Sequence, residues 1–333
     1  MQRFKFGAAA LLCALALPAW AAQPLRIGAA VYGLKGEFMQ MWVDALKRHP
    51  AVKDGSVQIT VFDGRYDALT QNNQFDTMIT QKYDAILFVP IDIAAGAEAV
   101  AKAARAKIPV IGSNTRVNGD QLTAYIGNND TVAGELQAEA VAKALKGKGN
   151  VVIIEGPIGQ SAQLERSAGN QKALARYPGI KVLERKPANW SRAEALTLME
   201  NWLTARPGQI NGLIGQNDDI ALGGLEAVRG KGLDPRKMPA AGIDGIRDGI
   251  VAVKNGTLMV SFFQDAKAQA QGALDLALRA VKGPVYQPRS DIWREYAKPM
   301  PWAGGAAKRY DVPWTTITPA NADALLAKLK PGA

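Results

Sequence analysis

Short apolar runs alternate along the chain with longer segments whose apolar residues recur at helical spacing. In the first half, this pattern predicts strands at 25–31, 57–62, 85–89, 109–112 and 123–127, with helices at 38–46, 68–79, 94–104 and 131–145. Strands that alternate with helices form parallel sheets, because each crossover helix returns the chain to the same end of the sheet. The pattern therefore predicts an α/β fold built from doubly wound parallel sheets.

The alternation starts again near residue 150. It predicts strands at 151–154, 180–183, 212–214, 240–243 and 258–263, with helices at 162–177, 192–204, 220–229, 245–255 and 266–282. One short segment also recurs, because 92–96 (Asp-Ile-Ala-Ala-Gly) differs from 219–223 (Asp-Ile-Ala-Leu-Gly) at a single position. Each copy follows an apolar strand and precedes a helix, which indicates two similar lobes that face each other across a ligand cleft.

The boundaries of the lobes follow from this order of elements. We expect the first lobe to contain 25–128 and 265–289, and the second lobe with the tail to contain 129–264 and 290–333. A hinge would join the lobes, with its first crossing near Asn128. The segment after 283 is richer in proline and aromatic residues, and it predicts a last strand at 314–317 and a helix after Pro319.

Residues 1–21 have the pattern of a secretory signal peptide. Arg3 and Lys5 give a positive start, an apolar run at 7–17 is too short to span a bilayer, and 19–21 (Ala-Trp-Ala) fits a cleavage site. Cleavage would remove Cys13, the single cysteine of the chain. We therefore expect a periplasmic, monomeric protein without disulfides or thiol chemistry.

The charge of the chain does not indicate a nucleic-acid partner. The sequence has 40 basic and 30 acidic residues, and loss of Arg3 and Lys5 with the signal peptide would leave 38 basic ones. The basic residues are scattered rather than grouped in blocks, which is typical of a solvated basic surface. We expect no nucleic-acid partner.

The sequence excludes several kinds of catalysis. His49 is the only histidine and precedes Pro50 at a predicted helix end, where we expect a surface residue. Nucleophilic triads and histidine-rich metal sites are therefore excluded, and no phosphate-binding glycine motif follows a strand. We expect no catalytic residue, cofactor or metal, although a glycosidase that uses two carboxylates from among Asp218, Asp219 and Asp244 remains open.

Polar side chains gather where predicted strands end. Gln216, Asn217, Asp218 and Asp219 lie between a strand and a helix, and either aspartate could simply cap that helix. Amides, carboxylates and guanidinium groups engage neighbouring hydroxyls in pairs, and aromatic faces cover C–H surfaces. The candidate ligand-binding residues at strand ends and in loops are Tyr32, Phe38, Asn114, Arg166, Trp190, Asn217, Asp244 and Gln264.

The order of elements and five motifs resemble the ribose-binding-protein family, over about residues 25–282. The motifs are Pro157-x-Gly159-x-Ser161-Ala162 with Glu165-Arg166, Ala188-Asn189-Trp190, Gln216-Asn217-Asp218, Gly242-Ile243-Asp244-Gly245, and Gln264. These proteins are the periplasmic sugar-binding components of ABC importers, related to lac-repressor-type ligand domains. The resemblance implies that Arg166 is a bidentate donor, Trp190 and Phe38 are stacking faces, and Asn217 and Asp244 contact hydroxyls.

The sequence departs from this family in the first lobe. Ribose binders carry an Asp-Arg pair where this chain has Asn114-Thr115, a small polar residue at Tyr32, and a second phenylalanine at Met39. We therefore expect a hydroxylated ligand other than ribose.

These observations favour a solute-binding protein that captures a sugar or polyol by hinge closure and delivers it to an ABC permease in the inner membrane. Two alternatives remain open at this point: a secreted carboxylate-dependent glycosidase, and a binder of a small signal molecule for chemotaxis or quorum sensing. A transcription factor is disfavoured, because no DNA-binding helix pair precedes the first lobe.

Overall fold

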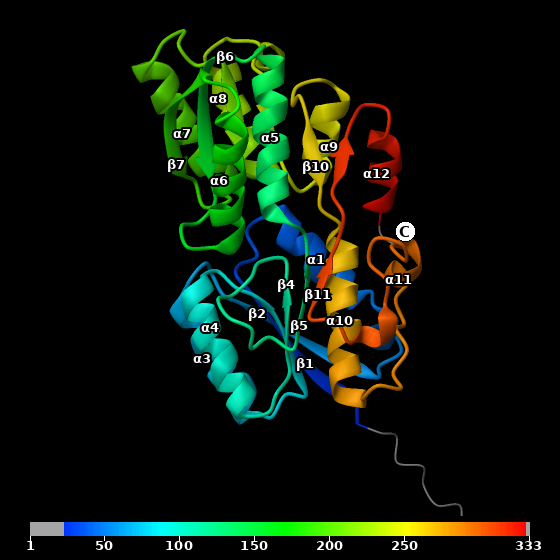
Figure 1. Cartoon of the computed structure of the whole chain (residues 1–333). Coiled ribbons are helices and arrows are strands. Elements are labelled where there is room, and N and C mark those ends of the chain that lie inside the picture. Colours follow the sequence, from blue (N-terminus) through cyan, green and yellow to red (C-terminus); the bar gives the residue numbers. More distant parts are fainter. Residues whose placement is uncertain (1–22, 331–333) are drawn as a thin grey trace, which may run out of the picture.

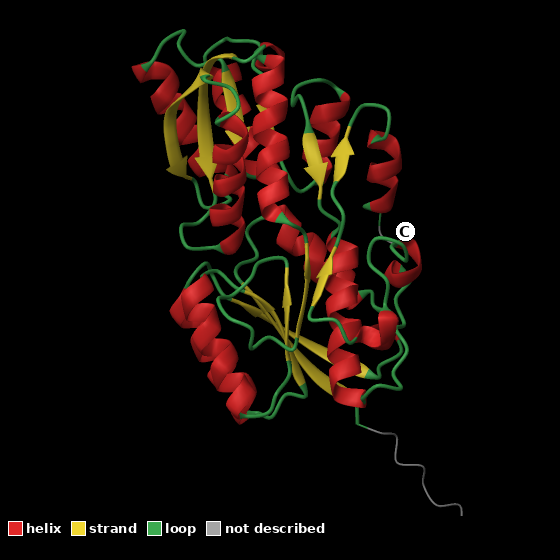
Figure 2. Cartoon of the chain, in the orientation of Figure 1, coloured by secondary structure: helices red, strands yellow, loops and turns green. Residues whose placement is uncertain are grey.

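A computed structural model describes residues 23–330, and the predicted signal peptide lies outside this range. The chain forms two lobes, each with a sheet covered by helices on both faces (Figures 1 and 2). This arrangement confirms the predicted α/β class and the two similar parallel-sheet lobes. Within residues 23–330, no helix has the length and apolar character needed to cross a membrane.

The first lobe is built on a six-stranded parallel sheet in the order β11-β5-β4-β3-β1-β2. Its strands are β1 (Leu25–Val31), β2 (Val57–Asp63), β3 (Ala85–Val89), β4 (Val110–Ser113), β5 (Ala124–Gly127) and β11 (Arg309–Asp311). Its helices are α1 (Glu37–Lys47), α2 (Pro50–Lys53), α3 (Ala68–Thr80), α4 (Ile93–Arg105), α10 (Ala266–Lys282) and α11 (Ile292–Glu295), with a 3-10 turn at Ala303–Gly305.

The central strands of this lobe are buried on both faces, which explains their continuous apolar runs. All five residues of β3 are buried. On one face α1 and α10 pack together, with Trp42 of α1 completely buried, and on the other face Phe75 of α3 contacts Phe88 of β3 edge to face at 4.6 Å.

The second lobe repeats this scheme with a four-stranded parallel sheet in the order β7-β6-β8-β9. Its strands are β6 (Lys148–Glu155), β7 (Gly179–Pro187), β8 (Gly212–Gly215) and β9 (Ala240–Ala241), and β10 (Ser261–Phe263) pairs antiparallel with β12 (Thr315–Ile317). Its helices are α5 (Asp130–Ala144), α6 (Ser161–Leu174), α7 (Arg192–Ala205), α8 (Asp218–Gly230), α9 (Arg247–Lys254) and α12 (Ala322–Lys328), with a 3-10 turn at Pro235–Lys237.

The chain passes between the lobes three times: from β5 to α5, from β10 to α10, and from β11 to β12 (Figure 1). The first crossing lies between the end of β5 at Gly127 and the start of α5 at Asp130. The last crossing divides the tail, which we expected to lie wholly with the second lobe. β11 extends the sheet of the first lobe beside β5, whereas β12 pairs with β10 of the second lobe.

Aromatic packing explains why the first part of the tail joins the first lobe. Trp293 contacts Trp302 at 4.7 Å and Tyr310 at 5.3 Å between ring centroids, both edge to face. Trp293 and Tyr310 are buried, and the Trp293 ring lies against α10 at Gly272. Burial of these rings stabilises the tail on α10.

His49 is completely buried, so the expectation of a surface histidine is wrong. Its Nδ1 accepts a hydrogen bond from the Ala51 N–H at 3.1 Å and caps α2. Nε2 therefore carries the proton and donates to Asp275 Oδ1 at 3.2 Å. The two partners satisfy both ring nitrogens, which makes burial of the imidazole favourable.

Asp275 anchors the start of the tail. Besides His49, its carboxylate accepts hydrogen bonds from the Tyr286 hydroxyl (2.6 Å), the backbone N–H groups of Arg289 and Ser290, the Ser290 hydroxyl (2.5 Å) and Trp293 Nε1 (2.9 Å). Burial alone would raise the pKa of Asp275, but the donors, with His49 first, outweigh burial and lower the pKa. The buried charge is thus held by its hydrogen bonds.

We predict that Asp275→Asn lowers the free energy of unfolding by about 3 kcal/mol at pH 7, because the amide keeps one acceptor oxygen and its NH₂ group would face donors that the carboxylate accepts from. Since the folded carboxyl group has a lower pKa than the unfolded one, its stabilisation is present at neutral pH and is lost as the pH falls through the folded pKa. Urea unfolding of both proteins should therefore show a difference that narrows on acidification. Asp291→Asn, at an exposed carboxylate, is the control, and an equal loss in both variants would contradict the prediction.

Candidate functional site

A small cavity with a volume of about 10 Å³ lies between the lobes. All eight residues predicted from the sequence line it, together with Gln160 and Ala162, which we did not predict. Each lining residue is at most 7% exposed. The cavity is lined by Tyr32, Phe38, Asn114, Gln160, Ala162, Arg166, Trp190, Asn217, Asp244 and Gln264.

The two lobes contribute different parts of this lining. Tyr32 follows β1, Phe38 lies in the first turn of α1, and Asn114 follows β4 in the first lobe. Gln264 lies at the second crossing, and the remaining lining residues come from the second lobe. The cavity therefore lies at the carboxyl ends of the strands, where open α/β sheets bind ligands.

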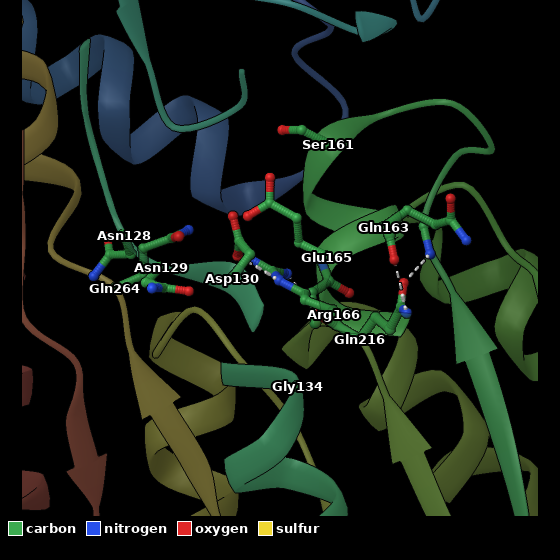
Figure 3. A network of polar contacts seen from close by, with 12 residues as sticks. Asn128, Asn129, Asp130, Gly134, Ser161, Gln163, Glu165, Arg166, Gln216 and Gln264 are labelled. Atoms are coloured by element: carbon green, nitrogen blue, oxygen red, sulfur yellow. Dashed lines mark hydrogen bonds and ion pairs between the residues drawn. The ribbon is translucent and has the colours of Figure 1, made fainter. Parts of the chain in front are cut away.

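Arg166 is the one basic residue of the lining and is only 3% exposed. Its Nε donates to Asp130 Oδ1 at 2.8 Å and its Nη1 donates to the Gln216 carbonyl at 2.6 Å (Figure 3). Burial alone would lower the pKa of Arg166, but the carboxylates of Asp130 and Asp244 raise it, so the guanidinium stays charged. Its other N–H groups can donate to a ligand in the cavity.

The close packing of α5 and α6 fixes the position of Arg166. A Cβ atom on Gly134 of α5 would lie 2.2 Å from the Arg166 carbonyl, and one on Gly169 of α6 would lie 2.1 Å from the Thr131 carbonyl. Both positions therefore need glycine, because any larger residue would push the helices apart. The backbone of Arg166 is thus held directly against α5.

Trp190 forms one wall of the cavity. Its ring lies against Gly156, where an added Cβ would come within 2.0 Å of the indole. Its Nε1 donates to Gln160 Oε1 at 2.7 Å, and the Arg166 guanidinium lies 5.5 Å from the ring centroid. These contacts leave the ring a defined face for the C–H groups of a ligand.

Asp244 supplies the carboxylate of the lining. It accepts from Asn217 Nδ2 and from Gln264 Nε2, each at 3.3 Å. Burial raises its pKa well above the ordinary value, and the charge of Arg166 opposes this rise. Gln264 Oε1 is buried and has no hydrogen-bond partner among residues 23–330, so it is available to a donor in the cavity.

Three lining residues have a backbone conformation that is unusual for residues other than glycine. Their φ angles are 62° at Asn114, 59° at Trp190 and 117° at Asp244. Such conformations cost free energy and concentrate at binding sites, where the surrounding structure holds them in place. The backbone thus orients these side chains toward the cavity at a cost in stability.

The residues of the polar run 216–219 have different roles, which the sequence alone did not distinguish. Asn217 both lines the cavity and caps α8, because its Oδ1 accepts from the Ile220 N–H at 3.0 Å. Gln216 is completely buried behind the site, where it accepts from the Gly156 N–H at 3.0 Å and donates to Ser167 Oγ at 2.8 Å.

Asp218 supports the loop that carries Asp244 and does not line the cavity. Its Oδ2 accepts from the N–H groups of Gly245 (2.8 Å) and Ile246 (3.1 Å), and its Oδ1 accepts from the Ser261 hydroxyl. Burial raises its pKa to about 7 against these three donors. Asp218 is therefore a positioning residue for Asp244.

Gln160 and Ala162 are the lining residues that sequence reasoning missed. Both belong to the segment 157–162, whose Pro-x-Gly-x-Ser-Ala pattern indicated a binding loop without showing which side chains point inward. Gln160 bridges the lobes, because it accepts from Trp190 and its Nε2 donates to the Pro90 carbonyl at 3.1 Å.

Comparison with known proteins identifies the family of the chain. Residues 27–284 match the family described as periplasmic binding protein domain. The chain belongs to this family. The match ends at residue 284, so the aromatic tail lies beyond it.

Three relatives show which members of the family are similar. The chain is 35% identical to the xylitol-binding protein of Mycolicibacterium smegmatis, over 78% of this chain and 75% of the relative. It is 32% identical to a putative rhizopine-binding protein of Rhizobium meliloti, over 85% and 92%. A solute-binding protein of an ABC transporter from Bacillus halodurans, solved with bound myo-inositol, is 30% identical over 92% and 99%, with a TM-score of 0.80.

These relatives are binding proteins, and the lining of the cavity is consistent with that class. Among residues 23–330, no group of three or more histidine, cysteine or acidic side chains is placed to hold a metal ion.

We predict that Gly156→Ala lowers the free energy of unfolding by about 2 kcal/mol and displaces Trp190, because the new methyl group overlaps the indole ring. Urea unfolding and the tryptophan emission spectrum measure the two effects. Gly230→Ala is the control, since its nearest contact would be 4.0 Å away. Equal unfolding free energies and equal emission spectra for the two variants would show that the position of Trp190 does not depend on glycine at 156.

Proposed function

We propose that this protein is a periplasmic solute-binding protein that captures a sugar or polyol by closing its two lobes and delivers it to an ABC permease. The observation that carries this proposal is the buried polar cavity between the lobes. It combines a charged guanidinium, a carboxylate, four amides and three aromatic side chains. Family membership and the relatives that bind xylitol and myo-inositol support the same function.

The polar groups of the cavity suit a ligand with several neighbouring hydroxyls. Arg166 can only donate hydrogen bonds, an ionised Asp244 can only accept them, and Gln264 Oε1 offers a second acceptor. A hydroxyl group can donate and accept at the same time, so adjacent hydroxyls can satisfy both sides of the cavity together. Phe38 and Trp190 would cover the C–H surface between them.

The relatives favour a ligand with one ring or a short chain. One of them is a xylitol-binding protein, and another was solved with bound myo-inositol. We therefore propose a monosaccharide or a polyol of similar size, in the class of xylitol or myo-inositol.

The position of Asp218 disfavours the glycosidase alternative. Glycoside hydrolysis by two carboxyl groups needs both of them beside the scissile bond. Asp244 is the only carboxylate that lines the cavity, and both oxygens of Asp218 accept hydrogen bonds from the protein. We therefore propose binding without turnover, by a monomer in the periplasm.

The lining residues come from both lobes, so a bound ligand favours closure of the lobes. A ligand that contacts Asn114 of the first lobe and Asp244 of the second lobe can make all of its hydrogen bonds only when the lobes are closed. It therefore shifts the population toward the closed form.

Isothermal titration against a panel of pentoses, hexoses, linear polyols and inositols tests this function. We predict that at least one polyhydroxylated compound binds, and that Asp244→Asn weakens its binding about 100-fold, because a charged acceptor of hydroxyl groups is lost. Asp248→Asn, at an exposed carboxylate of the same lobe, should leave the affinity unchanged. Absence of binding across the panel would contradict the proposal.

The affinity should also depend on pH. Burial raises the pKa of Asp244, whereas ligand hydroxyls that donate to the carboxylate favour its ionised form. The affinity should therefore rise with pH through the ligand-free pKa of Asp244, and binding should release protons. Titrations in buffers of different ionisation enthalpy measure this release, and Asp244→Asn should remove it. Proton uptake by the wild-type protein would contradict the assignment.

A further inference from the structure

The first turns of α6 contact the first lobe at a place separate from the ligand cavity. Arg116, in the loop between β4 and β5, donates from Nε to Glu165 Oε1 at 2.9 Å and makes a second hydrogen bond from Nη2 to the same oxygen. The Arg116 backbone N–H donates to Ser161 Oγ at 2.7 Å. The side chains of Arg116 and Glu165 are 35% and 18% exposed.

A second group of contacts lies beside this ion pair. The Ile93 N–H at the start of α4 donates to the Gly159 carbonyl at 3.1 Å, and Gln160 Nε2 donates to the Pro90 carbonyl at 3.1 Å. Gly159 has a φ of 89°, and a Cβ there would lie 2.6 Å from the carboxylate of Asp92. Only glycine allows the two lobes to come this close at 159.

These contacts join the two lobes, but most of them involve residues that do not line the ligand cavity. Arg116, Glu165, Ser161, Ile93 and Gly159 are not among the lining residues. Their hydrogen bonds form only when α6 lies against the first lobe, which is the closed arrangement. They therefore contribute to closure whether or not a ligand is present.

The same helix turn carries the groups that would contact the ligand. Arg166 follows Glu165 directly, and Gln160 accepts from Trp190, which is a wall of the cavity. If α6 moved away from the first lobe, the Arg116–Glu165 pair would break and the cavity would open at the same time.

We propose that the Arg116–Glu165 pair is a closing contact that stabilises the closed form of the protein without touching the ligand. Resting on the function proposed above, it also sets the ligand affinity, because the apparent dissociation constant scales inversely with the fraction of protein in the binding-competent form. Arg116 and Glu165 are then positioning residues of the site.

The test measures lobe closure in the absence of any ligand. Cysteines introduced at Leu69 of the first lobe and Val182 of the second lobe carry spin labels, because both side chains are well exposed and Cys13, the only native cysteine, lies in the predicted signal peptide. Double electron–electron resonance then gives the ratio of closed to open protein. We expect Arg116→Gln to lower this ratio about fivefold, as for a partly buried charge-assisted pair.

A matched control separates closure from general stability. Arg206 and Glu184 form the same two-bond ion pair, with 36% and 25% exposure, but wholly inside the second lobe. Arg206→Gln should therefore leave the distance distribution unchanged. Glu165→Gln should match Arg116→Gln, the two changes together should add nothing further, and the charge swap of Arg116→Glu with Glu165→Arg should restore closure.

An unchanged distance distribution in Arg116→Gln, or a change equal to that in Arg206→Gln, would overturn the proposal. The distance measurement uses no ligand. The proposed closing contact can therefore be disproved while the proposed binding function still holds. Titration with myo-inositol as the probe gives the second measurement, provided that the wild-type protein binds it. Arg116→Gln should then weaken binding by the same factor by which it lowers the fraction of closed protein.

Discussion

The structure of the site depends on one buried charge. Arg166 is almost completely shielded from water, and an unpaired guanidinium in such a place would be very costly. Asp130 and the Gln216 carbonyl satisfy one side of it, and each partner belongs to an element that shapes the site. Asp130 begins α5 just after the first crossing, and Gln216 directly follows β8. The pairing of one side chain therefore joins the hinge, α6 and the strand ends into one rigid wall.

The two-lobed fold gives this wall an opposing surface. Parallel strands in both lobes end toward the gap, so short loops bring amides and aromatic rings from distant parts of the sequence to one cavity. The second lobe supplies most of the charged and polar groups, and the first lobe supplies Tyr32, Phe38 and Asn114. The three crossings connect these surfaces. The third crossing depends on the tail, which Asp275 and the aromatic rings around Trp293 hold on the first lobe.

The alternation of apolar runs was sufficient to predict the fold, because strands buried on both faces leave a clear signal in the sequence. The family resemblance located the candidate residues, and the structure places them around one cavity. The sequence could not show that Asn217 would cap α8 while Asp218 turned to the neighbouring loop, since either side chain can accept an N–H. The burial of His49 and the division of the tail depend on Asp275, a partner 226 residues away from His49, which no local pattern indicates.

The most direct test of the central claim is a crystal structure of the protein as isolated from cells that grow on a mixture of sugars and polyols. We predict electron density for one polyhydroxylated molecule in the cavity, within hydrogen-bond distance of both Arg166 and Asp244. Density for a bound molecule elsewhere, with Arg166 and Asp244 free of contact to it, would contradict a binding site at this cavity.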